Sequence, residues 1–204
     1  MTISNGYCTL AEFKAELTTQ SISTNATNDA VIEDMIEAAS RHIDNETRRR
    51  FYANTNDETR YYTTKNPERV FTDDIQSITT LKLDLDLDRT YETTLATTDY
   101  DLMPTNASLN GEPYTWIERS PLGVYPFPSQ TKGIQIVGKF GYSSTTPDDI
   151  KRACLGIVMS LYQSRRGVGA EGVATITAAG VVITPKDVPP FADAIIKAHM
   201  RNWG

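Results

Sequence analysis

Residues Thr145–Gly167 read TTPDDIKRACLGIVMSLYQSRRG, and this stretch has the signals of a helix at both ends. Thr146 can cap the amino end, and Pro147 suits the first helical position because its missing N–H would have no partner there. Acidic residues follow where the helix dipole favours negative charge, and Gly167 is a typical stop signal. The pattern predicts a helix over residues 146–166.

The apolar residues of this helix recur at a spacing of three and four positions, so they share one face. The face consists of Ile150, Ala153, Cys154, Leu155, Ile157, Val158, Met159, Leu161 and Tyr162. So wide an apolar face indicates a buried, central helix, around which we expect the rest of the chain to pack.

The composition is that of a soluble protein, with 39% hydrophobic and 23% charged residues among 204. A formal charge of -6 disfavours nucleic-acid binding as the main source of affinity. The two cysteines, Cys8 and Cys154, do not form a disulfide framework, which favours a reduced, intracellular environment for assembly. The amino end lacks the features of a signal peptide, and the longest uncharged run is too short and polar to cross a bilayer, so we expect no membrane partner.

Periodicity divides the chain into an α+β arrangement: a helical bundle with an inserted antiparallel β region and a C-terminal arm. We expect a connector body over residues 1–167, with helices at 9–18, 28–49 and 146–166 and the β insertion at 51–141. The arm, residues 168–204, would hold a hairpin and a terminal helix. The expected strands are Thr59–Lys65, Arg69–Thr72, Ile78–Leu85, Asp99–Met103, Tyr114–Arg119 and Gly133–Phe140, with a proline-rich loop at Ser120–Pro128.

The predicted arm is apolar, and the residues that join it to the body favour a flexible connection. Glycines from Gly167 to Gly172 favour a hinge, Ala178–Gly180 suits a three-residue hairpin turn, and Phe191–Trp203 has a helical stripe. Because such residues are costly to leave in water, we expect them to bind a partner surface. The candidate partner-binding residues are Ile176, Val181, Val182, Ile183, Phe191, Ile195, Ile196, Met200 and Trp203.

A second candidate contact is the loop that contains Asp84, Asp86, Asp88 and Arg89. Its acidic residues resemble the opening of a calcium loop, but Arg89 stands where glycine should be and Leu95 where glutamate should be. The alternation of Leu with Asp instead predicts a hairpin with a charged outer face, which would contact another subunit or a neighbouring protein. A weak cation site remains the alternative.

No catalytic, cofactor-binding or metal-binding constellation is predicted. The glycines at 167, 169 and 172 spell GxGxxG, but they follow a helix and precede a strand, which is the reverse of a dinucleotide site. His42 and His199 lie in predicted helices, neither in a ligand-spaced cluster nor beside an obvious nucleophile. The pairs Asp73-Asp74 and Asp148-Asp149 are explained by a turn and by a helix start.

Four stretches in this order resemble the head-tail connector (adaptor, or head-completion) proteins of tailed bacteriophages. They are TLAEFKAEL, IEDMIEAASRHIDNETRRRFY, the insertion with DDIQSITTLKLDLD and TDYDLMPTN, and TPDDIKRACLGIVMSLYQSRRG, within residues 8–167. The resemblance implies a ring, most often a dodecamer, between the portal and a tail or neck-completion protein. It also implies a virion protein, assembled in the host cytoplasm, that extends the DNA channel, helps to retain the genome and does not bind DNA sequence-specifically.

Two other classes stay open at this point. One is a different neck or tail-completion protein. The other is an enzyme whose site is assembled from scattered Asp, Glu and Tyr residues, which would need a concave pocket with perturbed carboxylates. A gene position between portal or capsid genes and tail genes would favour the connector, whereas an operon of metabolic genes would count against it.

Overall fold

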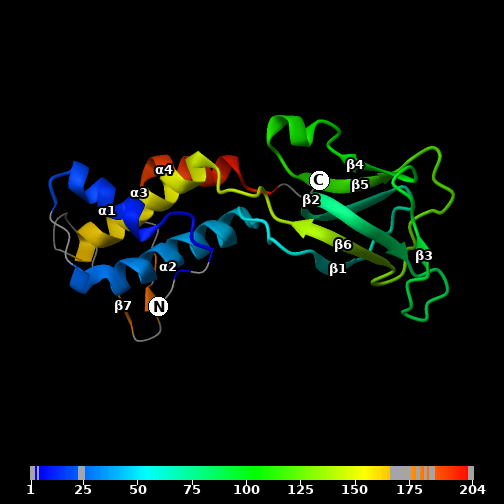
Figure 1. The fold of residues 1–204 in the computed structure, drawn as a ribbon, viewed down its shortest axis with the longest axis horizontal. Helices are drawn as coiled ribbons and strands as arrows, with labels where there is room; N and C mark the ends of the chain where they lie inside the picture. The colour runs from blue at the N-terminus through cyan, green and yellow to red at the C-terminus, as the bar shows by residue number, and fades with distance from the viewer. Residues whose placement is uncertain are drawn as a thin grey trace. The chain divides into compact units, whose positions relative to one another are not determined.

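The protein is described by a computed structural model that covers residues 3, 5–22, 26–165, 176–177, 180–181, 183 and 187–201. The chain divides into two units, Met1–Arg49 with Thr146–Gly204, and Arg50–Thr145. The four described α-helices belong to the first unit and a six-stranded antiparallel sheet belongs to the second (Figure 1). The α+β class and the β insertion are therefore as predicted. The predicted junction of body and arm at residue 167 lies outside the described residues and stays a prediction.

The helical unit has clear local signals at its helix ends. Its helices are α1 (Leu10–Thr19), α2 (Asp29–Thr47), α3 (Asp148–Arg165) and α4 (Pro190–Ala198), with a short 3-10 turn, η1 (Ala26–Asn28), before α2. Thr9 and Glu12 form the expected capping box at α1, and α2 ends at Arg48 in the left-handed conformation. The three body helices lie within two residues of their predicted bounds.

Helix α3 is central to this unit, as predicted. It packs against α2 on one side and α4 on another, and Cys154 and Ile157 are fully buried. The ring of Tyr162 meets Phe13 of α1 edge-on, with centroids 5.7 Å apart. The buried face predicted from the three-and-four spacing is therefore confirmed, and it is covered by helices on both sides of the β insertion in the sequence.

Two short strands, β7 (Ile176–Thr177) and β8 (Gly180–Val181), also lie in the helical unit and pair antiparallel. Thr177 pairs with Gly180, which leaves two residues between the strands. Gly180 is thus part of a strand rather than of the expected three-residue turn, and the other two residues of that expected turn lie outside the described residues.

The sheet unit has the strand order β1-β6-β2-β5-β4, with β3 paired to β2. Its elements are β1 (Glu58–Tyr62), β2 (Arg69–Leu83), β3 (Thr93–Thr94), β4 (Tyr100–Met103), η2 (Ala107–Asn110), β5 (Tyr114–Arg119) and β6 (Ile134–Phe140). All its pairings are antiparallel. Alternate residues of β2, β5 and β6 meet in one hydrophobic core that includes Leu81, Ile117 and Ile136.

Strand β2 corrects one expectation, since it is a single strand where two strands and a turn at Asp73-Asp74 were predicted. Register shifts between Phe71 and Ile75 let the long strand bend and continue. Asp73 accepts hydrogen bonds from the Arg60 guanidinium at 2.7 Å and from the Tyr62 hydroxyl at 3.0 Å. Cross-strand partners thus offset the poor strand propensity of aspartate.

Candidate assembly surfaces

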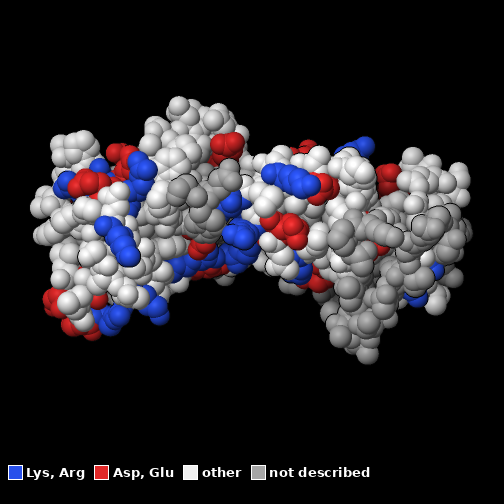
Figure 2. Space-filling model, turned by 180° about the vertical axis from the view of Figure 1, so that it is seen from behind, with Lys and Arg blue, Asp and Glu red and all other residues white. Residues whose placement is uncertain are grey.

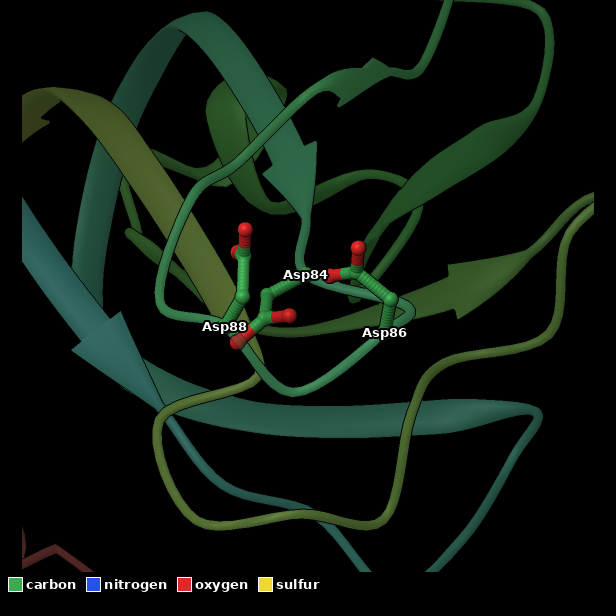
Figure 3. A group of neighbouring side chains, drawn as sticks. All are labelled: Asp84, Asp86 and Asp88. Atoms are coloured by element: carbon green, nitrogen blue, oxygen red, sulfur yellow. The ribbon is translucent and has the colours of Figure 1, made fainter.

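The acidic loop after β2 is the first candidate surface. Asp84, Asp86 and Asp88 each place a carboxylate oxygen within 4.8 Å of the other two, and they form the cluster of potential metal-binding groups found in the described part of the chain (Figure 3). Their roles differ, because Asp84 is buried while Asp86 and Asp88 are exposed. The Asp84 carboxylate accepts hydrogen bonds from the backbone N–H groups of Leu87, at 2.8 Å, and Arg89, at 3.2 Å.

These bonds hold the loop in an unusual backbone conformation. Leu87 and Arg89 both have positive φ angles, 74° and 71°, which non-glycine residues seldom adopt. The Arg89 guanidinium donates to the Thr131 carbonyl, and the Asp84 N–H donates to the Gly133 carbonyl at 2.9 Å. Of the four predicted contact residues, Asp84 and Arg89 therefore shape the loop, and Asp86 and Asp88 face solvent.

The leucines around this loop do not form one continuous face. Leu81 and Leu83 are fully buried, but Leu85 and Leu87 are 43% and 65% exposed. The predicted alternation ends because β2 stops at Leu83 and the chain turns there. The loop consequently presents two apolar and two acidic side chains together.

The C-terminal segment is the second candidate surface, and part of it packs on its own unit. Ala192 and Ile196 of α4 are buried, with α4 against α3 and α2. The Arg201 N–H donates to the Thr47 carbonyl at 3.0 Å. His199 lies 3.3 Å from Asp149 through Nε2, with its Nδ1 3.1 Å from the Ile195 carbonyl, so this histidine ties α4 to the start of α3.

The predicted partner-binding residues therefore differ in their surroundings. Ile196 is buried within the protomer, whereas Phe191 and Met200 are about half exposed and Ile183 and Ile195 are partly buried. Ile176 and Val181 pair across the β7–β8 hairpin. Val182 and Trp203 lie outside the described residues. The terminal helix also ends at Ala198 rather than Trp203, and it begins at Pro190, since proline suits a first turn.

A groove between α1, α3 and α4 is a feature that the sequence interpretation missed. Its volume is about 520 Å³. It is lined by Glu16, Gln20, Arg152, Leu155, Gly156, Met159, Ser160, Gln163, Pro189 and Phe191. The lining combines apolar side chains with charged and amide side chains. The available signal was the width of the apolar face on α3, because Leu155, which is only partly buried, and Met159 both line the groove.

The proline-rich loop between β5 and β6 is a further surface that was predicted only as a connection. Leu122, Val124 and Tyr125 are 76%, 74% and 44% exposed within a few residues. Large apolar side chains gathered this closely are typical of binding surfaces. The loop itself is held, since the Phe127 N–H donates to the Pro67 carbonyl at 2.9 Å.

Charge is distributed without a strong bias on the face drawn in Figure 2. Among the described residues visible there, Lys and Arg side chains lie next to Asp and Glu side chains, and no broad field of one sign covers the face. Ion pairs such as Arg119–Glu68 at 2.7 Å and Arg60–Glu58 at 2.6 Å bring opposite charges together among the described residues. None of the described helices combines the length and apolar character that a membrane crossing requires.

Comparison with solved structures gives an informative likeness. No protein-family model and no curated protein sequence matches the chain. Among solved structures, the chain is similar to one in the neck of an empty GTA (gene transfer agent) particle, computed with C6 symmetry. The similarity covers 100% of this chain and 95% of that chain, with a TM-score of 0.62 and 18% sequence identity. At this identity the match shows a common fold over the full length.

Proposed function

We propose that this chain is a structural subunit of the neck of a tailed-phage-like particle, where it forms a ring adaptor between the portal and the tail. The observation that supports this best is the fold shared over the whole chain with a protein of a particle neck. The sequence patterns of residues 8–167 also resemble those of head-tail connectors and favour the same role.

A ring of identical subunits needs two different surfaces on each protomer, because a head-to-tail contact joins one patch to another. The structure offers several unlike candidates, namely the groove in the helical unit and the apolar loops of the sheet unit. The sixfold symmetry used for the similar neck is compatible with twelve copies, since a ring of twelve contains the sixfold rotation. A dodecamer that binds the portal on one side and a tail or neck-completion protein on the other is the assembly we propose.

In this ring, genomic DNA passes through the channel without sequence-specific binding, and the ring helps to retain it. A net charge of -6 supports this role, because strong phosphate neutralisation would hinder sliding. The channel wall should therefore be acidic or neutral. Nanomolar binding of duplex DNA at physiological salt would contradict this part of the proposal.

The proposal is tested by expressing the full chain alone and together with the portal protein of the same particle. Native mass spectrometry and negative-stain electron microscopy should show a ring seated on the portal. A chain that stays monomeric with the portal and is absent from purified particles would overturn the proposal. An enzymatic role is the alternative, and hydrolytic or transfer activity in the monomer, with normal particles formed by an inactive variant, would favour it.

The C-terminal contact is tested with point variants rather than a truncation, because α4 is packed against α2 and α3 and its removal would expose their apolar surface. Phe191→Asp and Met200→Asp change half-exposed residues that we propose to contact the portal or a neighbouring subunit. Ala194→Asp, at an exposed position of the same helix, is the matched control. Both variants should impair joining to the neck. Met200→Asp should do so at unchanged melting temperature, whereas Phe191→Asp should also lower the melting temperature, because its ring packs over Gly156 of α3. Joining by both variants equal to that of Ala194→Asp would refute the contact.

A further inference from the structure

The two cysteines of the chain meet inside the helical unit. Cys8 precedes α1 and Cys154 lies in the middle of α3, 146 positions apart in sequence, and their Sγ atoms are 3.5 Å from each other. Both side chains are buried. We propose that Cys8 and Cys154 are a site of reversible covalent modification, at which a low-molecular-weight disulfide oxidises them to an intramolecular disulfide that ties the N-terminal segment to α3.

The backbone around Cys8 is held in place by several bonds to α2. The Tyr7 N–H donates to the Ser40 hydroxyl at 3.0 Å, and the Tyr7 hydroxyl donates to Asp44. The Arg41 guanidinium donates to the Asn5 carbonyl at 3.0 Å. These hydrogen bonds fix the backbone just before Cys8. The contact between the Cys8 and Cys154 side chains is therefore set by the fold.

A second link joins the same two segments on the other side of the thiols. Lys151, three residues before Cys154, donates to Glu12 of α1 at 2.9 Å. The cysteines therefore lie between a hydrogen-bonded turn and an ion pair that both hold the N-terminal segment in place. Formation of the bond requires the sulfurs to approach by about 1.5 Å, to the usual disulfide length near 2.0 Å, which side-chain rotation and small backbone shifts can supply.

The surroundings tolerate the loss of both thiol hydrogens. Ser40 lies 3.6 Å from the Cys154 sulfur, but its hydroxyl already donates to the Ile36 carbonyl at 2.7 Å and accepts from the Tyr7 N–H. A disulfide needs no hydrogen-bond partner. The oxidised form thus leaves no buried donor without an acceptor, and it fills the space that the two thiols occupy.

The reaction is thiol–disulfide exchange with a reagent such as oxidised glutathione. One cysteine thiolate attacks the reagent's S–S bond and releases a first glutathione thiolate, and the second cysteine then attacks the mixed disulfide, releases a second one and leaves the protein disulfide. Two protons go to the glutathione or the solvent. Because a hydrogen bond with Cys154 and burial both raise the pKa of the Cys8 thiol, the exchange should be slow and should need local opening of the N-terminal segment.

The test uses the full chain, equilibrated with mixtures of reduced and oxidised glutathione, once in native buffer and once in denaturant. Trapped samples are alkylated and weighed as intact protein, so that the disulfide, the mixed disulfide and the dithiol are separated by mass. Since the chain has only two cysteines, the pairing is unambiguous. If the native geometry favours the bond, the equilibrium constant for disulfide formation should be about 30- to 1000-fold larger in the native protein than in the denatured one.

By thermodynamic linkage, the oxidised protein must be more stable than the reduced one by the same factor. Its melting temperature should therefore rise by about 4–16 °C. Cys8→Ser and Cys154→Ser serve as controls that can form a mixed disulfide but not the internal bond. A native equilibrium constant equal to or below the denatured one, or an oxidised protein that melts at or below the reduced one, would overturn the proposal. Because both measurements use the unchanged sequence, the test holds even if a control variant fails to fold.

Discussion

Helix α4 contacts α3 at Gly156, where the ring of Phe191 lies against the glycine. Whether Gly156→Ala raises or lowers the free energy of unfolding should therefore depend on Phe191. A Cβ built on Gly156 would lie 2.3 Å from Cζ of Phe191, far inside van der Waals contact. Gly156→Ala should therefore push the Phe191 ring off α3. The substitution also removes a glycine from a helix interior, which by itself should stabilise the protein by about 1 kcal/mol.

The structure decides which of these effects is larger. Phe191 is 50% exposed, so about 100 Å² of a side chain that can bury about 200 Å² is covered. Loss of that contact would cost about 2.5 kcal/mol at 25 cal/mol per Å². The net effect of Gly156→Ala should be a destabilisation of about 1–2 kcal/mol, together with faster hydrogen exchange in α4.

The same substitution in a Phe191→Ala background should have the opposite sign. With no ring over the glycine, the helix-propensity gain of about 1 kcal/mol should remain alone. The four proteins of this double-mutant cycle are compared by urea unfolding followed through helical circular dichroism. If Gly156→Ala stabilises both backgrounds equally, Phe191 does not lie over Gly156, and α4 is not docked on α3 as described.

Three further predictions concern the core, the acidic loop and an ion pair. Ile157→Ala should lower the free energy of unfolding by about 2–5 kcal/mol, because the side chain is fully buried; an unchanged urea midpoint would show that α3 is not central. Asp84→Ala should lower the free energy of unfolding by about 1–3 kcal/mol and expose the loop to proteolysis, since two backbone N–H groups lose their acceptor. Asp86→Ala should change the free energy of unfolding by less than about 0.5 kcal/mol. Similar effects of the two substitutions would contradict the different roles of the two side chains. The hydrogen bond from Lys151 holds the pKa of Glu12 below its ordinary value, so the pair stabilises the fold at pH values above the pKa of the unfolded state, and this contribution is lost as the pH falls below about 4.5. In Lys151→Met, the free energy of unfolding should therefore depend less steeply on pH in that range. An unchanged slope would count against the pair.

The helices of the body could be predicted because residues close together in sequence determine where each helix begins and ends. The Thr9–Glu12 capping box acts within one turn, so no tertiary information is needed to place the start of α1. The wide face of α3 likewise indicated burial from spacing alone. What spacing could not indicate is which partner covers each part of that face, and for this reason the groove beside Leu155 was missed.

The errors share a physical cause, since each concerns a residue whose neighbours in space overrule its local preference. Asp73 looked like a turn residue, yet Arg60 and Tyr62 across the sheet satisfy its carboxylate within a strand. Asp84 looked like part of a charged outer face, yet it turns inward and accepts bonds from its own loop. Secondary-structure propensity describes a residue without its neighbours in space, whereas the conformations of Asp73 and Asp84 depend on the groups that hydrogen-bond to their carboxylates.

The sheet unit interrupts the helical unit in sequence, and its own hydrogen bonds explain how the fold accommodates this. The Tyr142 N–H donates to the Arg50 carbonyl at 2.7 Å, and the Ala53 N–H donates to the Ser143 carbonyl at 2.9 Å. The first and last residues of the insertion are thus paired with each other, so the unit closes on itself where the chain enters and leaves. Because entry and exit are adjacent, α2 and α3 can still pack together although about 100 residues separate them. The loops at Asp84–Asp88 and Leu122–Tyr125 belong to this closed unit, whose hydrophobic core is separate from the core that the helices form.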